Sequence, residues 1–248
     1  MQYKTPLRDM QFVLHELLDS SAHYKSIPQF AEVERDIIDS YIEAAASFAE
    51  NEIAPLNRSG DEEGCTFNNG EVTTPKGFKE AYKQYCELGF AALAAEEEFG
   101  GQGMPFSLGT VVNEIMGSAN WSFSMYPGLS HGAIATIEHH GTDEQKATYL
   151  EKMVTGEWSG TMCLTEAHAG SDLGIIRTKA EPNDDGTYSI TGQKIFISAG
   201  EHDMTDNIIH IVLARLPGAP AGTKGISLFI VPKVNVNEDG SLGDRNNV

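Results

Sequence analysis

The spacing of apolar residues changes near residue 158, and this change constrains the fold more than any other feature of the sequence. Before it, apolar residues recur at helical intervals; after it, short β-branched and apolar runs alternate with turns. A helical segment followed by a strand segment predicts an α+β chain rather than an alternating α/β fold. We predict an N-terminal extension over residues 1–30, a helical domain over 31–157 and a β domain over 158–248.

Several helices are predicted in the first part. Apolar residues at helical spacing predict a short helix over Met10–Leu18. Pro55 is expected to end the next helix, and the stretch Asn57–Gly70, rich in Gly, Asn and acidic residues, is expected to be a loop. Thr142 and Gln145 form the pattern of a capping box, so a helix should begin there. The other predicted helices are Ala31–Glu52, Thr74–Gly89, Ser107–Met116 and Phe123–His140.

Six short strands are predicted in the second part. Asp184-Asp185-Gly186 is expected to be a hairpin turn between two of them. The polar stretch Asn235–Val248 is expected to add no closing element, which would leave an incomplete β domain with an unprotected edge. The predicted strands are Met162–Thr165, Ile175–Ala180, Tyr188–Ile190, Ile195–Ser198, Ile208–Leu213 and Ile226–Val231.

Charge and composition exclude several classes of function. The chain has 17 Lys and Arg against 36 Asp and Glu, a net charge of −19, so neither nucleic acid nor an anionic membrane is an expected partner. It lacks a long apolar run and a secretory signal pattern, which favours a cytoplasmic protein. The three cysteines are widely spaced and the adjacent His139 and His140 would face different sides of a helix, so no metal site is expected.

The stretch Met162–Asp172 carries the clearest sign of a ligand site. A predicted strand ends near Thr165 and continues into small and hydroxylated residues. Gly170 allows a ligand to approach the backbone closely, and Thr165 and Ser171 supply hydroxyl groups. On these grounds alone, the stretch is either a loop that binds a polar ligand or an ordinary β-turn.

The same stretch resembles the first signature of the acyl-CoA dehydrogenase family, in which a Cys-hydrophobic-Thr-Glu strand end runs into Ala-Gly-Ser-Asp. Gly192–Gly200 resembles the family's Gly-x-Lys-x-Trp-Ile-Thr-Asn strand, Glu97–Gly103 its glycine-rich turn, and Glu144–Met153 the helix before its β domain. The order and spacing of these segments agree, so the resemblance covers about Ala31–Lys233. The long N-terminus resembles the long bacterial branch that includes 3-methylmercaptopropionyl-CoA dehydrogenases.

This resemblance implies a mainly antiparallel, β-barrel-like middle domain and an FAD cofactor. Phe196 stands where Trp is usual and would keep ring stacking; Ser198 stands where Thr is usual and could donate its hydroxyl to the N5 edge of the flavin. Ala167 and His168 replace the usual Pro-Gly, so this loop need not follow the family's fine geometry, although the implied ligand is the same. The implied flavin-binding residues are Met162, Cys163, Leu164, Thr165, Gly170, Ser171, Phe196, Ile197 and Ser198.

The resemblance also implies an acyl-CoA site. Ser171 would lie near the acyl-CoA as well as the flavin pyrophosphate. Met125 and Gly128 would line the acyl-chain pocket, although helical spacing equally allows Met125 to be a core residue.

The implied reaction is the α,β-dehydrogenation of an acyl-CoA to the trans-2-enoyl-CoA, with 3-(methylthio)propanoyl-CoA as the substrate suggested by the branch. A Glu in a C-terminal four-helix domain, beyond Val248, would remove the α-proton, whereas Glu166 is expected to be structural. The chain alone is therefore expected to show no turnover. An electron-transfer flavoprotein would be the electron acceptor, and the assembly would be a homodimer or homotetramer.

Three alternatives stay open. An acyl-CoA oxidase would use the same site and pass electrons to oxygen. A DNA-associated relative would keep the flavin and protect against alkylation, but the net charge of −19 argues against it. A catalytically inactive subunit would need a partner that supplies the base.

Overall fold

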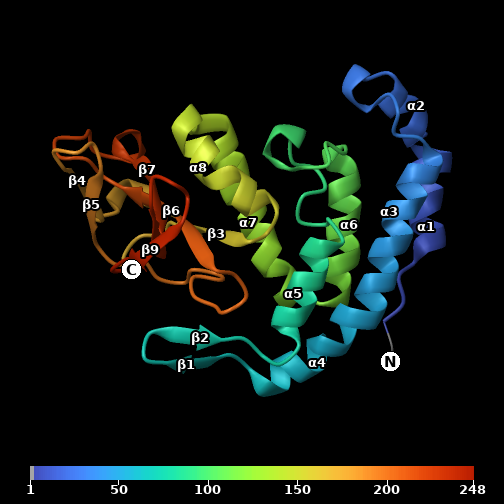
Figure 1. The fold of residues 1–248 in the computed structure, drawn as a ribbon, viewed down its shortest axis with the longest axis horizontal. Helices are drawn as coiled ribbons and strands as arrows, with labels where there is room; N and C mark the ends of the chain where they lie inside the picture. The colour runs from blue at the N-terminus through green and yellow to red at the C-terminus, as the bar shows by residue number, and fades with distance from the viewer. Residues whose placement is uncertain (1–2) are drawn as a thin grey trace.

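Helices occupy one side of the molecule and strands the other (Figure 1). The computed structural model describes residues 3–248. The predicted α+β organisation is confirmed, with helices followed by a mainly antiparallel β region whose strands do not close into a barrel. The α-helices are α1 (Leu7–Gln11), α2 (Ser20–Lys25), α3 (Arg35–Phe48), α4 (Ala54–Glu63), α5 (Phe78–Glu87), α6 (Phe106–Ala119), α7 (Trp121–His140) and α8 (Asp143–Val154).

The helical core forms where apolar residues repeat every three or four positions. On α3, Ile38, Ile42 and Ala45 are completely buried, which is the stripe that the sequence predicts. Aromatic side chains of α5 and α7 close the centre of this core, with the rings of Tyr85 and Phe123 packed edge to face 6.0 Å apart. The capping box at α8 is confirmed: the Thr142 hydroxyl accepts from Gln145 N and the Gln145 side chain accepts from Thr142 N.

The prediction that Pro55 ends a helix was wrong. The chain continues from α3 through a π-helical segment, Ala49–Ile53, into α4, and Pro55 lies in the first turn of α4. Proline has no N–H to donate, and the π-helical turn just before it changes the hydrogen-bonding pattern of the helix at this point. The sequence pattern could not show the π-helical turn that joins the two helices.

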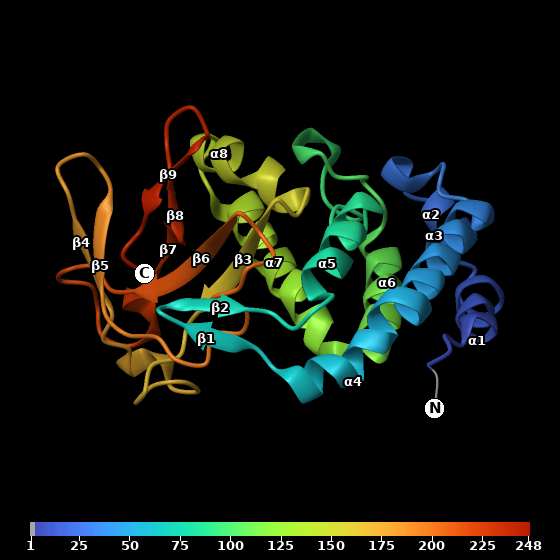
Figure 2. The same cartoon turned by 60° about the horizontal axis from the view of Figure 1, so that its bottom comes forward.

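The predicted loop Asn57–Gly70 was also wrong, because it holds most of α4 and the first strand of a hairpin. The hairpin pairs β1 (Thr66–Asn68) with β2 (Glu71–Thr73). Asn69 and Gly70 both have positive φ, as a two-residue hairpin turn requires. The hairpin reaches from the helices towards the β region (Figure 2). Directly after β2, Thr74 donates two hydrogen bonds to Asp203, which lies in the loop before β6 (Asn207–Ala214). This contact keeps Thr74 outside the helix, so α5 begins later than predicted.

A three-stranded sheet forms the centre of the β region. β3 (Trp158–Cys163) pairs in parallel with β6 (Asn207–Ala214), which pairs antiparallel with β7 (Ser227–Pro232). The predicted turn Asp184-Asp185-Gly186 connects β4 (Lys179–Pro182) to β5 (Tyr188–Thr191). The last fourteen residues contain part of a hairpin, β8 (Val234–Val236) with β9 (Leu242–Arg245), so this stretch is not made of turns alone. The hairpin is a separate two-stranded sheet and does not close the described β region.

The sheet packs directly on α7 and α8. The Gly160 N–H donates to the Ser130 hydroxyl at 3.0 Å, and a Cβ on Gly160 would lie 2.5 Å from the Ala133 methyl. Trp158, completely buried, joins residues from both helices and from β6 in one apolar cluster. Among the described residues, no helix combines the length and the apolar character required to cross a membrane.

Candidate functional site

Two loops from the signature segments meet at the end of β3. Ile195 N donates to the Thr165 carbonyl at 2.9 Å, and Lys194 Nζ donates to the Leu164 carbonyl at 3.2 Å. Residues 164–172 and 192–200 therefore form one wall, although nearly thirty residues separate them in the sequence. The structure brings together the two groups of residues that the sequence assigned to the flavin.

The segment around Ile195 is not the strand that the sequence predicts. After its single hydrogen bond to Thr165, the chain reaches Phe196 with φ +58°, and Ala199 follows with φ +54°. A left-handed residue turns the backbone out of the extended form, so a ladder cannot continue. The Phe196 ring is 88% exposed as a result. An exposed aromatic ring held by an unfavourable backbone conformation is a feature of ligand sites.

Glu166 fixes the two loops to each other. Its Oε1 accepts from Thr178 N, Thr178 Oγ1 and Lys194 Nζ at 2.9, 2.6 and 2.9 Å, and its Oε2 accepts from Arg177 N at 2.7 Å. Burial raises the pKa of Glu166, but these hydrogen bonds outweigh burial and lower the pKa to about 2. The carboxylate is therefore ionised and its oxygens are already bonded, which supports the structural role expected for it.

Polar groups on the wall remain available to a ligand. The hydroxyls of Thr165, Ser171 and Ser198 make no side-chain hydrogen bond to any residue in the range 3–248. Ser171 and Ser198 are exposed, and Thr165 is half-buried. The exposed Met162 adds an apolar surface at the end of β3. Hydroxyl donors beside an aromatic ring and a thioether suit a planar, acceptor-rich ligand.

The other predicted flavin residues differ in orientation. Leu164, Gly170 and Ile197 are half-buried within the two loops. Cys163 is buried instead, because neighbouring side chains of a strand point to opposite faces and Met162 takes the exposed one. Its Sγ lies 3.8 Å from His210 Nδ1, and burial raises the pKa of the thiol. The Cys163 side chain therefore belongs to the core of the sheet.

Residues predicted for the acyl pocket lie on α7. Met125 is half-buried and Gly128 is exposed, and a Cβ built on Gly128 would meet nothing within 4 Å. The helix is anchored close by, since the Tyr126 ring packs edge to face on His202 at 5.3 Å. The surface of α7 is therefore open at Gly128. Met125 is neither a fully buried core residue nor a fully exposed one.

Two buried histidines were missed by the sequence analysis. His202 Nε2 lies 3.0 Å from the Ser159 hydroxyl, and His210 Nδ1 lies 2.7 Å from the Thr161 hydroxyl. Burial, with a smaller contribution from the Lys233 ammonium, lowers the pKa of each histidine to about 4 and outweighs the opposing effect of the Glu201 carboxylate. Both imidazoles are thus neutral at neutral pH. The parallel pairing of β3 with β6 places His210 beside Thr161, whereas His202 reaches Ser159 from the loop before β6. Both contacts join residues more than forty positions apart, so no local sequence pattern predicts them.

Arg215 was missed as well. Its guanidinium donates to the carbonyls of Ile176, Gly174, Gly222 and Pro220. These bonds fasten the end of the signature loop to the loop after β6. Among residues 3–248, no group of three or more His, Cys, Asp or Glu side chains gathers where it could hold a metal ion.

Comparison with known proteins agrees with this geometry. Residues 38–157 match the model of the acyl-CoA dehydrogenase N-terminal domain, and residues 161–245 match that of the acyl-CoA dehydrogenase middle domain. The chain belongs to the acyl-CoA dehydrogenase family. The signature wall at the end of β3 therefore lies in the family's middle domain.

Individual members of the acyl-CoA dehydrogenase family are similar over most of this chain. The 3-methylmercaptopropionyl-CoA dehydrogenase of Ruegeria pomeroyi is 46% identical over 246 residues, which are 99% of this chain and 42% of that protein. The acyl-CoA dehydrogenase of Geobacillus kaustophilus has a similar structure, with a TM-score of 0.66 and 30% identity over 79% of this chain and 48% of its own. An acyl-CoA dehydrogenase complexed with FAD from Bacillus anthracis gives a TM-score of 0.65 and 26% identity, covering 82% and 32%. The chain thus spans less than half the length of these relatives.

Proposed function

We propose that this chain supplies the FAD-binding wall of an acyl-CoA dehydrogenase that acts on 3-(methylthio)propanoyl-CoA. The observation that supports the proposal most is the joining of the two signature loops by Lys194 and Ile195. Because these hydrogen bonds join the two loops, the exposed Phe196 and the free hydroxyls of Thr165, Ser171 and Ser198 lie on the same wall. The similarity to an acyl-CoA dehydrogenase complexed with FAD supports the choice of cofactor.

The residues of the wall fit a flavin by their chemistry. The Thr165, Ser171 and Ser198 hydroxyls would donate to ring acceptors and to the pyrophosphate, and Phe196 would pack on the ring system. When bound, FAD would accept the hydride from the β-carbon of the substrate while a carboxylate removes the α-proton. Glu166 would not be that carboxylate, because a group with a pKa of about 2 is a weak base and its oxygens are occupied.

The substrate proposal rests on α7 and on the relatives. Gly128 leaves the helix surface open, and the thioether of Met125 adapts to an acyl chain of irregular shape. The protein from Ruegeria pomeroyi, 46% identical, is a 3-methylmercaptopropionyl-CoA dehydrogenase. Ser171, exposed on the signature loop, would contact both the flavin and the acyl-CoA.

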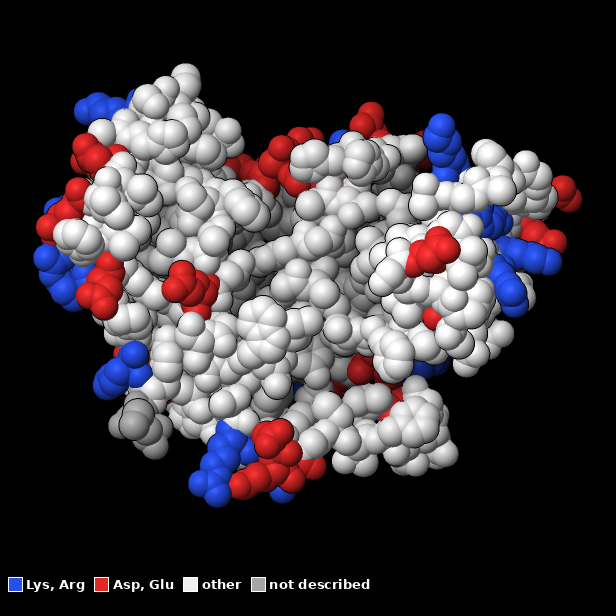
Figure 3. All heavy atoms as spheres, turned by 180° about the vertical axis from the view of Figure 1, so that it is seen from behind, with Lys and Arg blue, Asp and Glu red and all other residues white. Residues whose placement is uncertain are grey.

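Two further partners belong to this proposal. An electron-transfer flavoprotein would accept the electrons, and a second copy of the chain would complete a homodimer or homotetramer. Figure 3 shows a broad central area with few charged side chains, although the chain carries a net charge of −19. Depletion of charge is typical of the centre of protein interfaces.

The test uses the full natural polypeptide, purified without added flavin. We expect a yellow protein whose flavin absorbance bleaches anaerobically with 3-(methylthio)propanoyl-CoA. Reoxidation by an electron-transfer flavoprotein but not by air would separate a dehydrogenase from an oxidase. A colourless protein that takes up no FAD on reconstitution would overturn the proposal. Bleaching only by another acyl-CoA would keep the reaction class and refute the substrate.

A further inference from the structure

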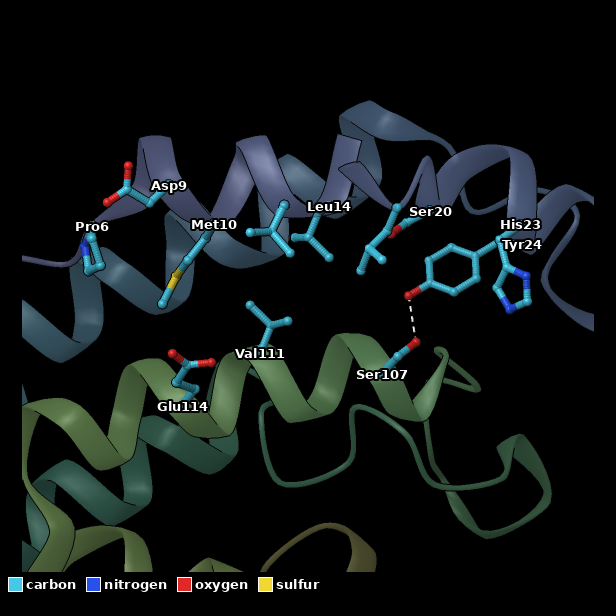
Figure 4. A pocket seen from close by; sticks show the side chains of 12 residues that line it. Pro6, Asp9, Met10, Leu14, Ser20, His23, Tyr24, Ser107, Val111 and Glu114 are labelled. Carbon is cyan, nitrogen blue, oxygen red and sulfur yellow. Dashed lines mark hydrogen bonds between the residues drawn. The ribbon is translucent and has the colours of Figure 1, made fainter. Parts of the chain in front are cut away.

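A cavity of about 630 Å³ lies between the N-terminal extension and α6. Figure 4 shows apolar side chains, including Met10, Leu14 and Val111, along its middle. Asp9 and Glu114 lie at one end of it. None of its lining residues belongs to the signature loops or to the proposed acyl pocket. The volume is within the range of sites that bind small molecules.

One wall of the cavity is an irregular helix. α1 passes at Phe12 into a π-helical segment, Phe12–Leu17, that contributes Val13 and Leu14 to the lining. Val13 and Leu18 remain substantially exposed, with exposed fractions of 41% and 60%. π-helical turns are rare and occur often at functional sites. The extension therefore leaves apolar surface open where a regular amphipathic helix would cover it.

The far end of the cavity holds the Ser20 hydroxyl, which has no partner among the described residues. Ser20 is only 6% exposed, yet its hydroxyl makes no hydrogen bond to any other residue in the range 3–248. Beside it, the Tyr24 and Ser107 hydroxyls are 2.6 Å apart and satisfy each other (Figure 4). A hydroxyl that faces the cavity without a protein partner can form a hydrogen bond to a ligand, so this end is suited to a ligand that brings a hydrogen-bonding group.

The opposite end of the cavity is negatively charged. Asp9 and Glu114 are exposed and form no salt bridge with any described residue, so an ammonium group at this end would be attracted and a carboxylate repelled. Ser107 and Glu114 are seven residues apart on α6, which corresponds to roughly 10 Å along the helix. An extended octyl chain has a similar length.

We propose that this cavity binds an elongated aliphatic amino alcohol, with its ammonium group at Asp9 and Glu114 and its hydroxyl at Ser20. The apolar side chains between these ends would contact the aliphatic chain. The site is independent of the proposed flavin chemistry, because it uses other elements of the chain. It would give the N-terminal extension a ligand-binding role of its own.

The test is calorimetric titration of the full natural polypeptide with ω-amino-octanol, octylamine and ω-hydroxyoctanoate. We expect saturable binding of the amino alcohol, at least about tenfold tighter than binding of the hydroxy acid, because the charge at the acidic end is reversed. S20A should weaken the binding of the amino alcohol about two- to tenfold and leave the binding of octylamine unchanged. V111F, which fills the cavity, should abolish binding.

The matched control is T110F, on the exposed face of the same helix, which should bind as the wild type does. Thermal unfolding of each variant would verify that it folds. If V111F does not fold, E114Q replaces it and should reduce the ratio of the affinity for the amino alcohol to that for the hydroxy acid. The proposal is overturned if the amino alcohol does not bind, if the hydroxy acid binds as tightly, or if S20A weakens both amines equally.

Discussion

The Lys194 ammonium lies 2.9 Å from the Glu166 carboxylate, and the two side chains are only 9% and 5% exposed. The pair connects the two signature loops at the point where they form one wall. Neither residue would contact the flavin by the proposed assignment. Their effect on the site would come through the positions of the residues beside them, Thr165 and Phe196.

Removing the ammonium should destabilise the protein strongly. K194M leaves the Glu166 carboxylate buried without its cationic partner, and such a change costs about 3 kcal/mol of unfolding free energy. It also frees the Leu164 carbonyl, so flavin should be lost more readily. Urea unfolding and flavin release of the full natural polypeptide measure the two effects.

The control is an ion pair of similar length on the surface. Arg58 Nε and Glu62 Oε1 are 2.7 Å apart but 88% and 62% exposed. E62Q should change the unfolding free energy by less than about 0.5 kcal/mol and leave flavin in place. Equal losses in K194M and E62Q would contradict the role of the buried pair.

Stability should fall in mildly acidic solution because of His202 and His210. Each has a pKa of about 4 when folded and takes up a proton near its ordinary value of 6.5 when unfolded. Their contribution is complete above pH 6.5 and is lost as the pH falls from 6.5 towards 4, by about 3 kcal/mol for each histidine. Urea unfolding at a series of pH values measures this loss.

Glu166 should lose its contribution to stability over a lower pH range than the two histidines. Its lowered pKa means that its contribution is lost only as the pH falls from the ordinary value of 4.5 towards about 2. NMR titration of the imidazoles gives the direct measurement, and an ordinary pKa for both histidines would refute the pH prediction.

Replacing Phe196 by glycine should separate folding from flavin binding. The residue has φ +58° and is largely exposed, so F196G removes about 1 kcal/mol of backbone strain from the flavin-free protein and should stabilise it. Loss of the ring should weaken flavin binding about tenfold. A199G, at φ +54°, should stabilise the protein by a similar amount without weakening flavin binding. A variant F196G with unchanged flavin affinity would remove Phe196 from the proposed site.

The same substitution should have opposite effects at two glycines. G160A brings a methyl to 2.5 Å from Ala133 and should destabilise the protein by about 1–3 kcal/mol. G128A meets open space within α7 and should stabilise the helix by about 0.5–1 kcal/mol, because alanine favours a helix over glycine. Thermal unfolding measures both, and enoyl-CoA formation shows whether G128A also disfavours bulky acyl chains. Similar stability losses in both variants would contradict the assigned packing.

Local patterns predicted much of the fold. The stripe on α3, the capping box at Thr142 and the hairpin turn at Asp185 each depend on residues within a few positions of one another, so the sequence contains all the required information. The hairpin turn at Asn69-Gly70 had an equally local signal that the composition of its surroundings obscured. Other local predictions went wrong where a distant contact intervened, as at Thr74, which binds Asp203 instead of capping α5.

By itself, the sequence determined the α+β order of the chain, its family and the two segments that form the candidate site. Only the tertiary structure decided which side chains of those segments are available. Parallel pairing of β3 with β6 directs Cys163 inward and Met162 outward, and the bond from Ile195 to Thr165 leaves Phe196 exposed instead of inside a strand. The ionised state of Glu166 likewise depends on donors up to twenty-eight residues away. Such outcomes follow from packing between distant segments, which a linear pattern does not encode.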